Sequence, residues 1–456
     1  MVWVHRLSAE NEQPADVLGS KGYGLNLLHR LGLPVPPGFI ISTLAGRALR
    51  RDGRWPDGLA DETAAAVREL AVETGRRPLV VSVRSGGAVS MPGMMSTILN
   101  LGLDPEDPLP PLEVAVTAVF RSWDTPRARM YRELNDIPHD LGTAVTVQSM
   151  VFGDRGEHSG SGVAFSRDPN TGAPSPYGEV LFGHQGEDVV SGRSLTLPLA
   201  ALAEREPAVW AGLADALRRI EAHYRDASSV EFTFEQGTLW LLQVRPGRFV
   251  GRAAVRVAVD LAVAGVISRS EAVRRFVPAQ LGLVRVPRLA TTDDGEFARG
   301  VGACPGVATG RVATTADAAA RMVAEGPVIL VRPETSPLDL HGLAAAAGVV
   351  TARGGPASHA AVVARSMGKP AVVGVEALTV DGSSVRAAGR TVGEGELITI
   401  DGTGGEVVLG RAGTVTGTDE PYLERLLAWA DEISGDHTSR PEADRLRAAH
   451  AVLDGK

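Results

Sequence analysis

Residues 349–368 are the part of the chain whose local fold is most constrained by its sequence. An apolar run, a glycine turn, Ser358 as a capping residue and Gly368 as a stop predict a strand, a tight turn and a helix. His359 then lies in the first helical turn, where the positive helix end disfavours an imidazolium and stabilises an attached anion. We therefore expect His359 to be a neutral nucleophile that carries phosphate, and not merely a structural first-turn residue. Nearby cations are expected at Arg332, Arg353 and Arg365.

Residues 229–245 give a strong hairpin signal, with strand-like runs on both sides of a Gln-Gly turn. A two-residue loop over 236–237 would pair Glu231 with Leu242 and put Gln243 on the other face. We predict a three-residue loop over 235–237, which puts Glu231, Gln243 and Arg245 on one face. Glu231 and Gln243 could then hold Mg²⁺ while Arg245 grips nucleotide phosphates. The alternative is a surface hairpin with scattered polar residues.

Three glycine-rich segments are candidates for phosphate contacts. Residues 19–24 precede an apolar helix and contain Lys21, one of three lysines among 46 basic residues. Their spacing is not that of a P-loop, so this signal is weak on its own. Residues 82–95 combine an arginine, glycines and three methionines, for which a hydrophobic lid is the alternative. Residues 157–164 have little side-chain bulk. From the last two segments we expect phosphate contacts at Arg84, Gly93, Ser161 and Gly162.

The composition narrows the class of protein. The chain has 456 residues, which suggests about three domains. Its net charge of -8 disfavours a nucleic-acid partner. No apolar stretch reaches the ~18 residues that span a membrane, and the N-terminus has no secretion pattern, so we expect a cytoplasmic protein without a membrane partner. A single cysteine, Cys304, excludes a disulfide framework within the chain.

Periodicity and breaker residues predict the main elements. Linkers are expected over 280–299 and 411–418, where periodicity is lost. Helices are expected over 61–74, 112–134 with a break near Pro126, 253–276 with a cap at Ser268, and 421–433. Strands are expected over 78–83, 144–150, 328–331, 348–351 and 397–401.

Five segments together resemble the pyruvate phosphate dikinase family, which is related to the phosphoenolpyruvate synthases. They are residues 19–39, 83–103, 141–148, 185–190 and 330–359. The resemblance implies an α/β and α+β multidomain fold. Its expected parts are an ATP-grasp nucleotide-binding domain (1–250), a helical connector and linker (251–300), a swivelling β/β/α phosphohistidine domain (301–410) and a helical tail (411–456).

The resemblance also implies a chemistry. The family cleaves ATP to AMP, passes a phosphoryl group through a histidine and converts pyruvate to phosphoenolpyruvate. His359 is expected as the phosphocarrier, with Arg84 and Arg245 as catalytic partners. ATP and Mg²⁺ are expected at Lys21, Arg84, Glu231, Gln243 and Arg245.

The sequence departs from the family pattern in several places. Family members are much longer and end in a TIM barrel that binds pyruvate, whereas residues 423–456 resemble only the connector that enters it, so we expect a short form. A helical insert that the family has after Leu103 is reduced, and the basic residues expected near the inorganic phosphate are lost with it. Ser229 replaces an expected acid, and Ala357 replaces a threonine.

The leading expectation is an AMP-forming phosphotransferase that phosphorylates His359 from Mg-ATP. The acceptor is left open between pyruvate on a separate barrel protein and another small molecule, with inorganic phosphate as a further partner. One alternative is a phosphohistidine carrier or interaction module without ATP hydrolysis, and another is an inactive relic. We also expect residues 302–410 to swing as a rigid body, with His359 more than ~15 Å from Glu231 at rest.

Overall fold

The computed structural model describes the chain except residues 1, 90, 92, 192, 193, 195, 248, 291–294, 417–419 and 456. Parts of both expected linkers, 291–294 and 417–418, therefore lie outside the described residues. The chain forms two compact units, Met1–Ser161 with Phe182–Gly186 and Val230–Arg245, and Gly162–Leu181 with Glu187–Ser229 and Pro246–Lys456. The expected α/β and α+β multidomain class is confirmed, while the four domain boundaries stay a prediction. None of the described helices is long and apolar enough to cross a membrane.

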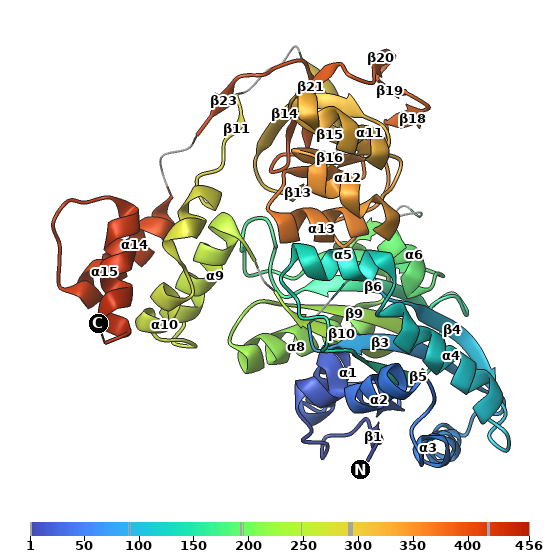
Figure 1. Cartoon of the computed structure of the whole chain (residues 1–456). Coiled ribbons are helices and arrows are strands. Elements are labelled where there is room, and N and C mark those ends of the chain that lie inside the picture. The colour runs from blue at the N-terminus through green and yellow to red at the C-terminus, as the bar shows by residue number, and fades with distance from the viewer. Residues whose placement is uncertain are drawn as a thin grey trace. The chain divides into compact units, whose positions relative to one another are not determined.

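The first unit is built on a five-stranded antiparallel sheet (Figure 1). Its strands, in spatial order, are β1 (Val4–Arg6), β2 (Gly38–Ile41), β5 (Thr143–Ser149), β3 (Leu79–Gly87) and β4 (Thr97–Leu103). Its helices are α1 (Ala15–Arg30), α2 (Thr43–Asp52), α3 (Leu59–Thr74), α4 (Leu109–Ser122) and α5 (Pro126–Leu134). Alternate apolar residues of β3 and β5, such as Val81 and Val147, pack against Leu112 and Phe120 of α4 to form the core.

A hairpin follows a series of shorter elements. These are β6 (Gly160–Phe165), β7 (Tyr177–Phe182), α6 (Gly186–Ser191), β8 (Leu197–Pro198), α7 (Ala200–Arg205) and α8 (Pro207–Tyr224). The hairpin strands are β9 (Ser228–Glu235) and β10 (Thr238–Pro246). Only Gln236 and Gly237 lie between them, and both have positive φ, 50° and 76°. The predicted three-residue loop was wrong, because Gln236 takes the left-handed conformation that a two-residue hairpin turn of this kind needs at its first position.

The second unit contains an eight-stranded mixed sheet that carries the histidine segment. Its spatial order is β12 (Glu296–Arg299), β22 (Glu406–Leu409), β21 (Leu397–Asp401), β14 (Val307–Ala313), β15 (Val328–Arg332), β16 (Gly348–Thr351), β17 (Ala371–Val373) and β13 (Val301–Cys304). Strands β14 to β17 are parallel neighbours. The accompanying elements are α11 (Ala316–Met322), η2 (Val323–Glu325), η3 (Pro337–Asp339), α12 (Leu340–Ala345), α13 (His359–Met367) and the small sheet β18 (Thr379–Asp381), β19 (Ser384–Ala387) and β20 (Arg390–Gly393).

A helical cluster completes the second unit (Figure 1). It consists of α9 (Gly251–Val263), α10 (Arg269–Arg274), η1 (Pro278–Leu283), α14 (Pro421–Ser434) and α15 (Glu442–Leu453). Ser268 caps α10 as expected, its hydroxyl accepting from the Glu271 amide at 3.0 Å. The chain leaves and re-enters the cluster through two paired strands, β11 (Arg288–Leu289) and β23 (Thr414–Val415).

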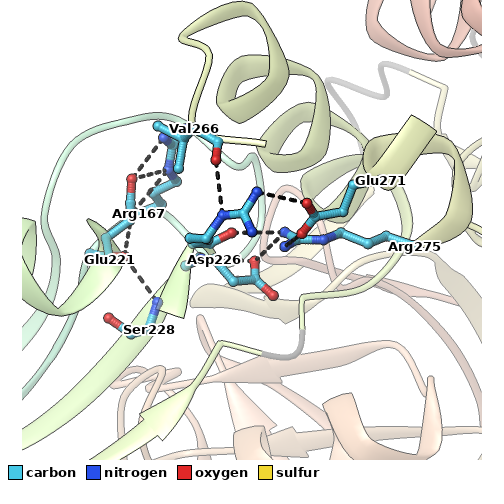
Figure 2. Close-up of polar contacts among 10 residues, drawn as sticks. Arg167, Glu221, Asp226, Ser228, Val266, Glu271 and Arg275 are labelled. Carbon is cyan, nitrogen blue, oxygen red and sulfur yellow. Dashed lines mark hydrogen bonds and ion pairs between the residues drawn. The ribbon is translucent and has the colours of Figure 1, made fainter. Parts of the chain in front are cut away.

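Ion pairs attach this helical cluster to the end of α8 and to β6 (Figure 2). Buried Arg167, just after β6, contacts Glu221 of α8 at 2.8 Å and Asp260 of α9 at 3.2 Å. Arg225 donates to the Val266 carbonyl at 2.9 Å and to Glu271 at 2.8 Å. The link between α8 and the cluster therefore includes both ion pairs and a charged hydrogen bond to a backbone carbonyl.

Candidate functional site

Lys21 is positioned by a break in α1. Gly19 leaves the helical conformation with φ 69° and ψ 159°, and a Cβ there would overlap the Gly86 carbonyl oxygen. The chain therefore approaches the glycines at the end of β3, where Ser20 Oγ donates to the Gly87 carbonyl at 2.8 Å. Burial, followed by the positive charge of Arg84, lowers the pKa of Lys21 well below its ordinary value, although Glu231 opposes this.

Arg84 lies on β3 and is almost fully buried, at 8% exposure. Its Nη2 donates to Gln148 Oε1 at 2.7 Å and to the Leu242 carbonyl at 2.8 Å. Its Nε is buried and has no partner among the residues that the structure describes. Burial lowers the pKa of Arg84, and an unpartnered buried guanidinium N–H is suited to a bound anion.

Glu231, Gln243 and Arg245 converge, although the loop between their strands is not the predicted one. Arg245 Nη2 lies 3.0 Å from Glu231 Oε1. With the Gln243 amide oriented by its hydrogen bonds, its oxygen accepts from Arg245 Nε at 2.7 Å and Nη2 at 3.0 Å. The Arg245 guanidinium thus contacts both Glu231 and Gln243 and brings the three side chains together.

These charges keep Glu231 ionised. Burial by itself raises the pKa of this carboxyl, but Arg245, Lys21 and Arg84 outweigh burial and lower it. Three basic side chains therefore surround one carboxylate, an arrangement that favours a polyphosphate. No cluster of three or more acidic, histidine or cysteine side chains suited to a metal occurs in the described part of the chain. The metal-binding role of Glu231 and Gln243 stays a prediction.

The other predicted phosphate residues are less defined. Ser161 is buried and its hydroxyl shares a 2.9 Å hydrogen bond with Thr233 Oγ1 of β9. Gly162 follows it on β6. Gly93 has a φ of 72°, which disfavours a side chain. The binding roles of Ser161, Gly162 and Gly93 stay predictions.

His359 begins α13, directly after the strand β16 and its glycine turn, as the sequence predicts. Its Nδ1 shares a hydrogen bond with Thr335 Oγ1 at 3.2 Å. Its Nε2 is buried and unpartnered among the described residues. Burial lowers the pKa of His359 to about 4, against the opposing charge of Asp339. The imidazole is therefore neutral near pH 7, and burial is the main cause rather than the helix end that the sequence predicts.

The three expected cations near His359 are already engaged. Arg353 forms an ion pair with Glu334, and Arg332 lies 3.5 Å from Asp339. Arg365 donates to the Ala303 and Pro356 carbonyls.

Two residues that the sequence argument did not single out, Thr335 and Gln148, contact candidate site residues. Both residues lie inside the segments that resemble the family, and this position is the sequence feature that could have identified them.

The candidate site residues divide between the two units. Lys21, Arg84, Ser161, Glu231, Gln243 and Arg245 belong to the first, and His359 to the second. The expected separation of His359 from Glu231, more than ~15 Å, stays a prediction.

Two family models match this chain. The model for the pyruvate phosphate dikinase AMP/ATP-binding domain matches residues 45–196, and that for the mobile domain of PEP-utilising enzymes matches residues 324–405. These matches confirm the expected nucleotide-binding domain and mobile domain.

Curated relatives extend the likeness along nearly the whole chain. Pyruvate, phosphate dikinase 2 of Oryza sativa subsp. japonica is 36% identical over 93% of this chain and 58% of its own length. The pyruvate, phosphate dikinases of Rhizobium meliloti (strain 1021) and Clostridium symbiosum are each 36% identical, over 99% and 94% of this chain and 62% and 60% of their own lengths. This chain spans about three fifths of the length of these relatives. At this level of identity, and with both domain models matched, the chain belongs to the pyruvate phosphate dikinase family.

Proposed function

We propose that this chain is an AMP-forming phosphotransferase that binds Mg-ATP in its first unit and phosphorylates His359. The observation that carries the proposal is the state of His359, a buried imidazole whose pKa is lowered to about 4. With Nδ1 occupied by Thr335 and Nε2 unpartnered among the described residues, Nε2 is the nitrogen available for phosphorylation.

The transfer balances as a simple displacement. The Nε2 lone pair attacks a phosphorus of ATP, the N–P bond forms, and the electron pair of the broken P–O bond leaves on the nucleotide side. The Thr335 hydroxyl accepts the Nδ1 proton in a hydrogen bond and so selects the tautomer with a free lone pair on Nε2. No general base is needed to deprotonate the nucleophile.

The first unit supplies the charge that ATP requires. The basic side chains of Lys21, Arg84 and Arg245 surround Glu231 and lower the pKa of its carboxyl. Bound Mg²⁺ would neutralise phosphate charge, with Glu231 and Gln243 as its protein ligands. Both residues now bond to Arg245, so the metal would require Arg245 to turn from them toward the phosphates.

The acceptor follows from the relatives rather than from this site. Those relatives are named pyruvate, phosphate dikinases, and we therefore propose pyruvate as the acceptor and phosphate as a co-substrate. The second half-reaction would take place on a separate pyruvate-binding barrel protein, or with another small molecule as the acceptor. A cytoplasmic location remains part of the proposal.

Labelled ATP tests the proposal directly. ATP carrying label at the β- or γ-phosphorus, incubated with Mg²⁺ and with or without phosphate, should leave acid-labile, base-stable label on the protein and release AMP. His359→Asn should abolish the label. His341→Asn is the matched control, because His341 is a surface histidine paired with Asp317 at 2.9 Å. Label that survives in His359→Asn, or no label from either position, would contradict the proposal.

A further inference from the structure

We infer that Gln148 is a positioning residue for nucleotide phosphate binding, because it holds the Arg84 guanidinium in a fixed orientation beside Glu231 and Arg245. This inference rests on the proposed function, since it assigns a role within the same ATP site. Gln148 is not charged and does not itself need to contact the nucleotide.

Gln148 is placed for this role by the sheet. It lies on the central strand β5, two residues beyond Thr146, which pairs directly with Arg84 of β3. Residues two apart on a strand share a face, so Gln148 is the diagonal neighbour of Arg84. Its side chain is 1% exposed.

Both ends of the Gln148 amide are used. Oε1 accepts from Arg84 Nη2 at 2.7 Å, and Nε2 donates to the Pro36 carbonyl at 2.8 Å. Rotating the amide would set its donors against the Arg84 donors and its acceptor against a carbonyl, so only one orientation satisfies both partners. The orientation of the Gln148 amide is therefore fixed, and its hydrogen bond in turn fixes the orientation of the Arg84 guanidinium.

Arg84 transmits this constraint to the hairpin. The Nη2 that Gln148 holds also donates to the Leu242 carbonyl at 2.8 Å. The neighbouring Leu241 amide donates to the Pro34 carbonyl at 2.8 Å. The loop that contains Pro34 and Pro36 thus fixes both Gln148 and the strand that carries Gln243 and Arg245.

The neutral charge of Gln148 matters as much as its geometry. With Nη2 engaged, the buried Nε of Arg84 is left without a partner among the described residues. A neutral acceptor orients the guanidinium without neutralising it, whereas a carboxylate at position 148 would pair with Arg84 and remove charge from the phosphate site.

A double-mutant cycle tests the role. Gln148→Met keeps the side-chain length but removes both hydrogen bonds, and should weaken Mg-ATP binding by about tenfold or more. If Gln148 acts through Arg84, the Gln148→Met/Arg84→Met double variant should bind Mg-ATP within about twofold of Arg84→Met alone. The loss should be confined to ATP, with adenosine binding unchanged, because adenosine has no phosphate. A purely structural defect would weaken both ligands.

Two further variants keep the test decisive. Thr146→Val is the matched control on the same strand, since its buried hydroxyl has no partner among the described residues, and it should leave ATP binding unchanged. Gln148→Glu keeps an acceptor if the methionine variant fails to fold, and should still lose ATP affinity without losing adenosine affinity. Losses that add in the double variant, or equal losses for ATP and adenosine, would overturn the positioning role alone. Failure of the unaltered chain to bind Mg-ATP would overturn the proposed function as well.

Discussion

At the scale of single residues, Thr335 has the most direct influence on His359. Replacing it with valine keeps the shape but removes the partner of Nδ1. The proton could then move to Nε2. We expect the activation free energy of His359 labelling from ATP to rise by about 1–1.5 kcal/mol, so that the rate falls roughly tenfold. ATP affinity should not change, because Thr335 belongs to the second unit, whereas Lys21, Arg84 and Arg245 belong to the first. Single-turnover labelling measures the rate, and Thr335→Ser should restore it. An unchanged rate in the valine variant would show that Thr335 does not select the tautomer.

His359 also predicts how stability depends on pH. Its pKa is about 4 in the folded chain, against about 6.5 when unfolded. Between these values the unfolded chain binds more protons, so the free energy of unfolding should fall as pH decreases from about 6.5 toward 4. His359→Asn should lose this part of the pH dependence. Urea unfolding of both proteins at pH 7 and pH 5 is the measurement, and parallel pH dependences would contradict the assignment.

At the scale of elements, Gly19 determines where α1 meets β3. Gly19→Ala should cost both the strain of a left-handed alanine and the overlap with the Gly86 carbonyl. Gly53→Ala is the matched control, because its φ is 71° and no atom lies within 4 Å of its added Cβ. We expect about 1 kcal/mol of destabilisation for the control and at least ~2 kcal/mol more for Gly19, with loss of ATP affinity. Equal destabilisation of the two variants would show that α1 shifts freely.

The ion pairs between α8 and the helical cluster make a second element-scale prediction (Figure 2). Arg167→Met would leave Glu221 and Asp260 without their buried cation, which should cost about 3 kcal/mol or more. The Arg269–Glu432 pair is the control, since its side chains are 61% and 53% exposed. Arg269→Met should change the free energy of unfolding by less than about 0.5 kcal/mol. Chemical denaturation compares the two, and similar values would mean that the Arg167 pairs add no more than a surface pair.

The elements also show what the sequence could and could not predict. Strand 348–351 and helix 421–433 match β16 and α14 closely, because burial and capping act locally. The hairpin loop was mispredicted, since glutamine rarely adopts positive φ and only strand pairing enforces it at Gln236. Gln148 was missed because its partners, Arg84 and Pro36, are 64 and 112 residues away in the chain.

At the scale of the whole molecule, the phosphoryl group must travel from an ATP site in one unit to an acceptor. The chain passes between the helical cluster and residues 302–410 through β11 and β23 and the segments that flank them, and the cluster is attached to α8 through Arg167. We therefore expect the mobile domain to move about the paired linkers as one body, so that His359 serves two stations in turn.

A reversible lock tests this movement. Within the second unit, Glu179 Oε1 accepts from the Ala357 amide at 2.7 Å, two residues before His359. Cysteines at positions 179 and 357, in a Cys304→Ser background, can be joined by a short cleavable cross-linker. The lock holds the histidine loop against β7, so it should permit at most one of the two half-reactions, labelling from ATP or transfer to the acceptor. Cleaving the linker should restore the other, and each single cysteine treated with the same reagent is the control. If both half-reactions persist in the locked protein, the phosphoryl group does not travel by a domain swing, and His359 does not carry it between sites.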